Sequence, residues 1–152
     1  MIIEDSILIA APLDAVWKAL GDVPRVAQCI PGARIEEIVD ERTYRCAVAI
    51  KVGPVAVSYR ATLTVVAHDD AAHRADYAVS GKEARGRGGV NAQMSATASR
   101  VGPADTRLDL RTDAKLSGII VTVGGRLIEG VAKRVSADFA RNLSAMLRDT
   151  PS

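Results

Sequence analysis

Hydrophobic and polar residues alternate along several stretches of the chain, a pattern typical of strands with one buried face. In residues 107–116 every second position is apolar or small, and every position between them is charged. The same alternation recurs in 44–52, 55–65, 75–79 and 90–98. Residues 3–10 form a shorter strand-like stretch. We therefore predict an antiparallel sheet in which 44–52 and 55–65 make a long hairpin around Gly53–Pro54.

Helical spacing appears in two other places. Val16, Trp17 and Leu20 predict a short helix after Ala11–Pro12, because proline suits the first turn of a helix. A second short helix is expected from Pro24 to about Cys29. From 123 to 147 one apolar stripe predicts a helix of roughly 37 Å at 1.5 Å per residue. The residues of this stripe are Leu127, Ile128, Val131, Val135, Phe139, Leu143, Met146 and Leu147.

We predict the order of elements as a strand, two short helices, six strands and one long helix, in which the alternating stretches named above are five of the six later strands. An antiparallel sheet with one polar face must cover its other face. The long helix is sufficient, because a seven-stranded sheet is only about 29 Å wide at 4.8 Å per gap. We predict an α+β helix-grip fold: a curved seven-stranded antiparallel sheet around a long C-terminal helix. Residues 1–148 would form a single domain, and 149–152 a short tail.

Inward positions on the late strands of the predicted sheet carry small side chains. Ala92, Ala96, Ala98 and Ala114 all fall on this face. Two interpretations follow: either the sheet and the helix pack very closely there, or a cavity remains between them. Protein interiors are close-packed, so a persistent cavity usually indicates a binding site.

Composition narrows the class of protein. The hydrophobic fraction of 48% and charged fraction of 25% are ordinary for a soluble globular domain. Twenty Lys and Arg against 18 Asp and Glu give a net charge of +2, which argues against a dedicated nucleic-acid binder.

The start of the chain lacks the pattern of a signal peptide. The longest uncharged apolar segment, 116–125, is shorter than the roughly 20 residues that span a bilayer. Cys29 and Cys46 form no CxxC motif. We expect a cytoplasmic protein.

Two polar motifs invite a chemical interpretation. Residues 81–89 contain Gly-Lys, but a phosphate-binding loop needs Ser or Thr after the lysine and a helix beyond it. A hairpin connection is favoured; contact of Lys82, Arg85 and Arg87 with anionic lipid headgroups is the alternative. Residues 68–73 hold both histidines and two aspartates. This segment is a turn signal, and a metal site or a Ser-His-Asp triad there lacks a third group nearby.

Four segments resemble one known family: Ala11-Pro12 with Val16-Trp17 and Leu20, Cys29-Ile30-Pro31-Gly32-Ala33, Lys51-Val52-Gly53-Pro54-Val55, and Gly118-Ile119 followed by Gly125-Arg126-Leu127-Ile128. They are similar to the carbon monoxide dehydrogenase G-subunit family of the START/Bet v 1-like (SRPBCC) superfamily. The resemblance implies a helix-grip fold with a deep hydrophobic pocket and no catalytic machinery. Such proteins accompany molybdenum-containing hydroxylases and are linked to their recruitment to the membrane, where electrons pass to quinone. Val121-Thr122-Val123 departs from the family's more usual Ala-x-Leu.

The expected function is thus non-catalytic. The protein would bind a quinone- or lipid-like molecule, carry no covalently bound cofactor, and partner a carbon monoxide dehydrogenase-like hydroxylase at the inner face of the cytoplasmic membrane. A cyclase- or dehydratase-type enzyme and a docking scaffold with a filled core are the alternatives. The candidate ligand contacts are Tyr59, Tyr77, Met94, Leu110, Leu116, Ile119, Leu127, Ile128 and Val131. The two tyrosine hydroxyls would bond the ligand or, alternatively, the backbone.

Residues 116–130 connect the last strand to the long helix. The phosphate-binding interpretation of Gly124–Gly125 lacks a βαβ context. We instead predict a mobile apolar gate beside the pocket mouth, formed by Ile119, Ile120, Val121 and Val123. Gly118, Gly124 and Gly125 would let it move, so that it meets a membrane surface and passes a ligand inward.

Overall fold

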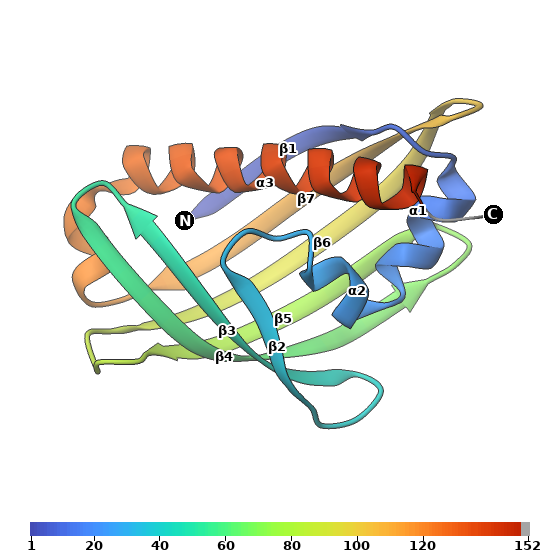
Figure 1. Ribbon diagram of the computed structural model, residues 1–152. Helices are drawn as coiled ribbons and strands as arrows, with labels where there is room; N and C mark the ends of the chain where they lie inside the picture. The colour runs from blue at the N-terminus through green and yellow to red at the C-terminus, as the bar shows by residue number, and fades with distance from the viewer. Residues whose placement is uncertain (150–152) are drawn as a thin grey trace.

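The computed structural model describes residues 1–149 as one antiparallel sheet with three α-helices on its concave side (Figure 1). The elements are β1 (Ile2–Ile9), α1 (Leu13–Leu20), α2 (Val23–Ala27), β2 (Ala33–Ile38), β3 (Thr43–Val52), β4 (Val55–Asp69), β5 (Arg74–Glu83), β6 (Gly89–Gly102), β7 (Asp105–Leu116), the 3₁₀ helix η1 (Ile119–Val123) and α3 (Gly125–Arg148). Residues 150–152 of the expected tail lie outside the described residues.

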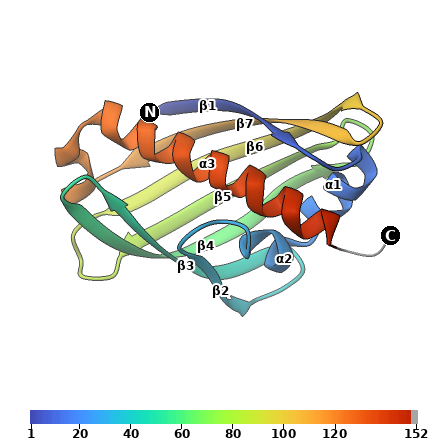
Figure 2. The same ribbon diagram turned by 45° about the horizontal axis from the view of Figure 1, so that its top comes forward.

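The sheet has the strand order β1-β7-β6-β5-β4-β3-β2, and all neighbours are antiparallel. It curves around α3, which crosses the concave face in both views, with α1 and α2 near its C-terminal end (Figures 1 and 2). The predicted helix-grip fold is confirmed. Alternation sets which side chains face α3: on β7, Leu108 and Ala114 are buried whereas Arg107 and Lys115 are exposed.

Local chemistry accounts for the ends of the short elements. Pro12, with φ −62°, stands at the N-cap of α1 rather than inside its first turn. The Asp22 side chain accepts a hydrogen bond from the Arg25 amide at 3.3 Å and so caps α2. Gly53, with φ +59°, makes the turn between β3 and β4.

The buried side chains form two separate clusters at opposite ends of α3. The first cluster joins β1, α1 and the late strands to the C-terminal half of α3 through Ile9, Val16, Leu108, Phe139 and Leu143. The second cluster contains Val52, Val57 and Ile120, with Ile128 and Val131 from the first turns of α3 packed against it. The concave face between the two clusters positions the candidate site.

The turn predicted over residues 68–73 is present at residues 70–73, after His68 and Asp69 at the end of β4, and it folds over α1. The Trp17 ring stacks on His68 at 4.4 Å between centroids and meets His73 edge-on at 5.5 Å. Its Nε1 donates to Asp70 Oδ1 at 2.8 Å. The two imidazoles thus pack on an indole, and residues 1–149 contain no group of three or more side chains arranged to hold a metal.

Candidate functional site

The concave face of the sheet is incompletely covered between the two clusters. Met94 on β6 is paired with Tyr77 of β5 and Thr112 of β7, so its side chain points inward with theirs. It is nevertheless 37% exposed. An inward side chain in a packed core would be buried, so solvent reaches the concave face here. Val48, Leu63, Val79 and, from α3, Val135 are also only half-buried.

A pocket of about 260 Å³ opens from this face beside α1 and α2. Its apolar wall comes from Leu20, Val23 and Val65, and Tyr44 and Tyr77 contribute rings. Its rim is polar, because Glu41, Arg42 and His68 surround it. The lining of this pocket is therefore mixed, with apolar side chains and the two tyrosine rings on one side and charged or polar side chains around them.

The nine predicted ligand contacts lie in four places. Five of them meet in the second cluster: Tyr59, Leu116, Ile119, Ile128 and Val131. Tyr77 and Leu110 pack against the first cluster, and Met94 lies between the two. Leu127 is 40% exposed and packs on the β3–β4 turn, where its Cδ2 would stand 2.7 Å from a Cβ at Gly53. Their role in ligand binding stays a prediction.

Tyr77 is the polar group best placed in the pocket. Burial, followed by the nearby Asp76 charge, raises the pKa of its hydroxyl to about 12. Tyr44, on the same wall, donates its hydroxyl to the Glu41 carbonyl at 3.2 Å. The Tyr77 hydroxyl forms no hydrogen bond within residues 1–149, so it is available as a donor. Burial also raises the pKa of Tyr59, helped by the charge of Glu83.

A buried carboxylate, paired with a partly exposed arginine, lies at the other end of the concave face. Glu83 ends β5 and is 3% exposed. Its carboxylate accepts hydrogen bonds from Arg87 Nε at 3.1 Å, the Ser58 amide at 3.1 Å and the Arg85 amide at 2.8 Å. Arg87 also donates to the Ala56 carbonyl at 2.8 Å. These bonds, the one from Arg87 first, lower the pKa of Glu83 to about 2.

This ion pair changes the interpretation of residues 81–89. The hairpin connection predicted for residues 81–89 is present at residues 84–88, because 81–83 belong to β5 and Gly89 belongs to β6. Arg87 is held by Glu83 and by the backbone of β4, so much of its hydrogen-bonding capacity is used within the fold. Contact of Lys82, Arg85 and Arg87 with lipid headgroups stays a prediction. The available sequence signal was a glutamate and an arginine four residues apart, Glu83 and Arg87. It was weak, because the segment around them is rich in glycine and shows no regular pattern.

The segment 116–130 is anchored more firmly than the gate prediction assumed. Ile120 is 4% exposed inside the second cluster, and only Val121 of the four apolar residues is exposed, at 51%. Gly118, with φ +87°, lies so close to the β5–β6 connection that a Cβ would stand 1.9 Å from the Arg87 carbonyl oxygen. A glycine is therefore needed at position 118 for close packing, not for motion. Gly124, with φ +90°, has open space around it. Gating itself stays a prediction.

The fold and the partly covered concave face define a helix-grip protein of the START/Bet v 1-like class. Residues 6–148 match the carbon monoxide dehydrogenase G-subunit (CoxG) family, so the chain belongs to this family and the resemblance noted in its sequence is confirmed. No curated protein matches the sequence significantly.

Solved structures share the fold. A conserved protein from Geobacillus kaustophilus has a TM-score of 0.86 and 24% identity, over 97% of this chain and 95% of that chain. The Zhui aromatase/cyclase from Streptomyces sp. R1128 has a TM-score of 0.67 and 18% identity, over 97% and 93%. A START superfamily protein from Mycobacterium smegmatis has a TM-score of 0.65 and 12% identity, over 97% of each chain. Within residues 1–149, no helix is both long and apolar enough to cross a membrane.

Proposed function

We propose that this protein binds a quinone- or lipid-like molecule on its concave face without acting on it chemically. In that role it would assist a molybdenum-containing carbon monoxide dehydrogenase-type hydroxylase at the inner face of the cytoplasmic membrane. The observation that carries the proposal is the inward but 37% exposed Met94, between two packed clusters. Membership of the CoxG family supports the choice of partner.

The ionisable groups of the concave face favour binding over catalysis. A general base works best with a pKa near the operating pH. Glu83 has a pKa of about 2 and its oxygens are already occupied by Arg87 and two amides. Tyr77, with a pKa of about 12, is a weak acid and a good neutral donor. Such a donor suits a ligand carbonyl, which a quinone would supply.

Native mass spectrometry with menaquinone and ubiquinone analogues tests the ligand part of this proposal. The wild-type protein should retain an analogue, and Met94→Lys should lose it, because the ammonium would have to be buried beside the ligand. Gln93→Lys is the matched control, since the neighbouring side chain is exposed on the opposite face of β6. If neither analogue binds the wild-type protein, or if both variants bind equally, the carrier proposal fails.

The partner part needs a separate experiment. Purified hydroxylase would be sedimented with vesicles of bacterial lipids, in the presence and in the absence of this protein. We expect more hydroxylase in the vesicle fraction when the protein is present. An unchanged fraction would contradict recruitment while leaving ligand binding untouched.

A further inference from the structure

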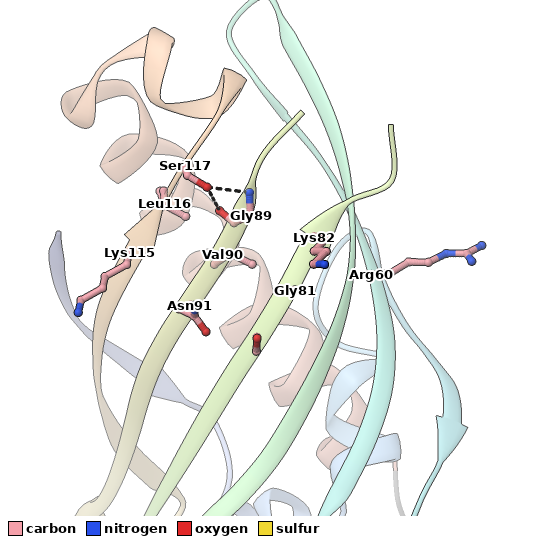
Figure 3. Close-up of a pocket in the computed structure, with 10 residues that line it drawn as sticks. Arg60, Gly81, Lys82, Gly89, Val90, Asn91, Lys115, Leu116 and Ser117 are labelled. Carbon is pink, nitrogen blue, oxygen red and sulfur yellow. Dashed lines mark hydrogen bonds between the residues drawn. The ribbon is translucent and has the colours of Figure 1, made fainter. Parts of the chain in front are cut away.

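A hollow larger than the ligand pocket lies on the convex face of the sheet, away from that pocket. It measures about 600 Å³ and crosses β4, β5, β6 and β7 near the start of α3. We call it the convex hollow. Figure 3 shows it with α3 behind the sheet: Arg60 and Lys115 stand at opposite margins, and Lys82 and Asn91 lie between them.

The register of β4 to β7 places the polar side chains of the convex hollow opposite one another. Arg60 on β4 is directly opposite Lys82 on β5, and Asn91 on β6 is directly opposite Lys115 on β7. Ser80 pairs with Asn91 across β5 and β6. Gly89 adds no side chain at the centre, and its amide donates to Ser117 Oγ at 3.0 Å. The result is a recess bordered by three cations, in which neutral hydrogen-bonding groups lie beside the apolar side chains of Val90 and Leu116.

The cations around the convex hollow are less fully paired with carboxylates than several others on the convex face. Toward the other end of the strands, Arg74 pairs with Asp76 at 3.1 Å, Arg107 with Asp109 at 3.0 Å and Arg111 with Glu4 at 3.9 Å. Lys82 and Lys115 form no ion pair within the described part of the chain, and Arg60 reaches Glu36 only at 4.0 Å. Positive charge around the convex hollow is therefore left largely uncompensated, which makes it complementary to an anionic partner.

We propose that the convex hollow docks an acidic segment of a partner protein. From Arg60 to Lys115 the cations span three inter-strand gaps, about 14 Å at 4.8 Å each. Alternate side chains of an extended segment are about 6.7 Å apart, so acidic residues at every second position match this span. One phosphate or carboxylate alone would reach only part of it. The proposal does not depend on a ligand inside the protein.

A membrane surface fits the same charges less well. A bilayer would cover an area wider than the hollow and so approach the exposed carboxylate of Asp113, two residues before Lys115 on the same face of β7. Anionic lipids would be repelled by that carboxylate. A narrow segment avoids it by following the hollow.

The probe is a fluorescent peptide of alternating Glu and Thr, and its Gln/Thr counterpart is the uncharged control. Binding to the full chain is measured by anisotropy at low and at physiological ionic strength. We expect the Glu peptide alone to bind, with affinity reduced by salt. Lys82→Gln/Lys115→Gln should raise its Kd about fivefold, given the modest energy of each exposed charge pair. Lys18→Gln/Arg100→Gln makes the same change in net charge elsewhere and should leave Kd nearly unchanged.

Three outcomes would overturn the proposal: wild-type affinity in the Lys82/Lys115 variant, an equal loss in the Lys18/Arg100 variant, or no binding of the Glu peptide at all. Vesicles with and without phosphatidylserine complete the experiment. Binding to anionic vesicles that depends on Lys82 and Lys115, without peptide binding, would assign the hollow to the membrane instead. Quinone-analogue binding in the same variants separates this proposal from the proposed function, because loss of one leaves the other measurable.

Discussion

At the scale of single residues, Glu83 shows how one buried carboxylate fixes a connection to a neighbouring strand. Its bonds to Arg87, Ser58 and Arg85 tie the β5–β6 connection to β4. The ordinary pKa of 4.5 is lowered to about 2 in the folded protein. A lowered carboxyl pKa means that the ionised form stabilises the fold above pH 4.5, and that this contribution disappears as the pH falls toward 2.

Glu83→Gln should therefore destabilise the protein at pH 7, because an amide brings N–H groups toward Arg87 and the Ser58 amide. The difference in unfolding free energy from wild type should shrink as the pH is lowered from 4.5 toward 2. Urea denaturation across this range measures it. Glu129→Gln is the control, since Glu129 forms an exposed pair with Lys133 at 3.2 Å. A pH-independent difference for Glu83→Gln would refute the assignment.

Tyr77 allows the ligand contribution of a hydroxyl to be separated from its structural contribution. Tyr77→Phe keeps the ring that packs on the first cluster and removes a hydroxyl with no partner within residues 1–149. We expect an unchanged melting temperature and a quinone-analogue affinity lowered about fivefold, the effect of one neutral hydrogen bond. Tyr44→Phe, which loses the bond to Glu41, should show the reverse: lower stability and nearly unchanged affinity. Equal affinities of wild type and Tyr77→Phe would remove Tyr77 from the site.

At the scale of elements, η1 is held by the contact between Gly118 and the β5–β6 connection. Gly118 and Gly124 both have conformations that only glycine adopts readily, at φ +87° and +90°. Alanine at Gly124 should therefore cost about 1–3 kcal/mol from backbone strain alone. Alanine at Gly118 should cost clearly more, because its Cβ would also overlap the Arg87 carbonyl. Thermal denaturation of the two single variants measures the difference; equal losses would mean that this contact does not anchor η1.

Regular elements were predictable from sequence where side chains alternate between a buried and a solvated face. Residues 107–116 are the clearest case, because every outward residue of β7 is charged. The strand β2 gave a weaker signal: it lies at the sheet edge, most of its residues are exposed, and a register shift falls between Ile35 and Glu37. The 3₁₀ helix η1 was not predicted, since five residues are too few to show a period.

The candidate site was less predictable than the elements, because it depends on contacts between segments distant in sequence. Five of the nine expected contacts meet in the second cluster, since they share an inward face near the start of α3. Leu127 follows the same helical stripe but turns toward Gly53. The packing of His68 and His73 on Trp17 joins residues about 50 positions apart, and no local pattern indicates it.

At the scale of the whole molecule, two clusters secure the ends of α3 and leave the middle of the concave face open to solvent. Small side chains on the strands contribute to this, as Ala92 and Ala114 pair across β6 and β7. Under the proposed function, stability and binding would lie in different places: the clusters hold helix and sheet together, and the interval between them would admit a ligand. A scaffold with a filled core would instead bury Met94.

Two substitutions on β6 distinguish a protein with an open concave face from a scaffold with a filled core. Met94→Trp adds volume where the concave face is exposed, so it should change the unfolding free energy by less than about 1 kcal/mol, while abolishing quinone-analogue binding by occupying the site. Ala96→Leu, two residues along the same face, adds volume inside the first cluster and should cost about 1–3 kcal/mol. Urea denaturation and native mass spectrometry give both values. If Met94→Trp destabilises the protein as much as Ala96→Leu does, the middle of the concave face is packed, and the protein is a scaffold rather than a carrier.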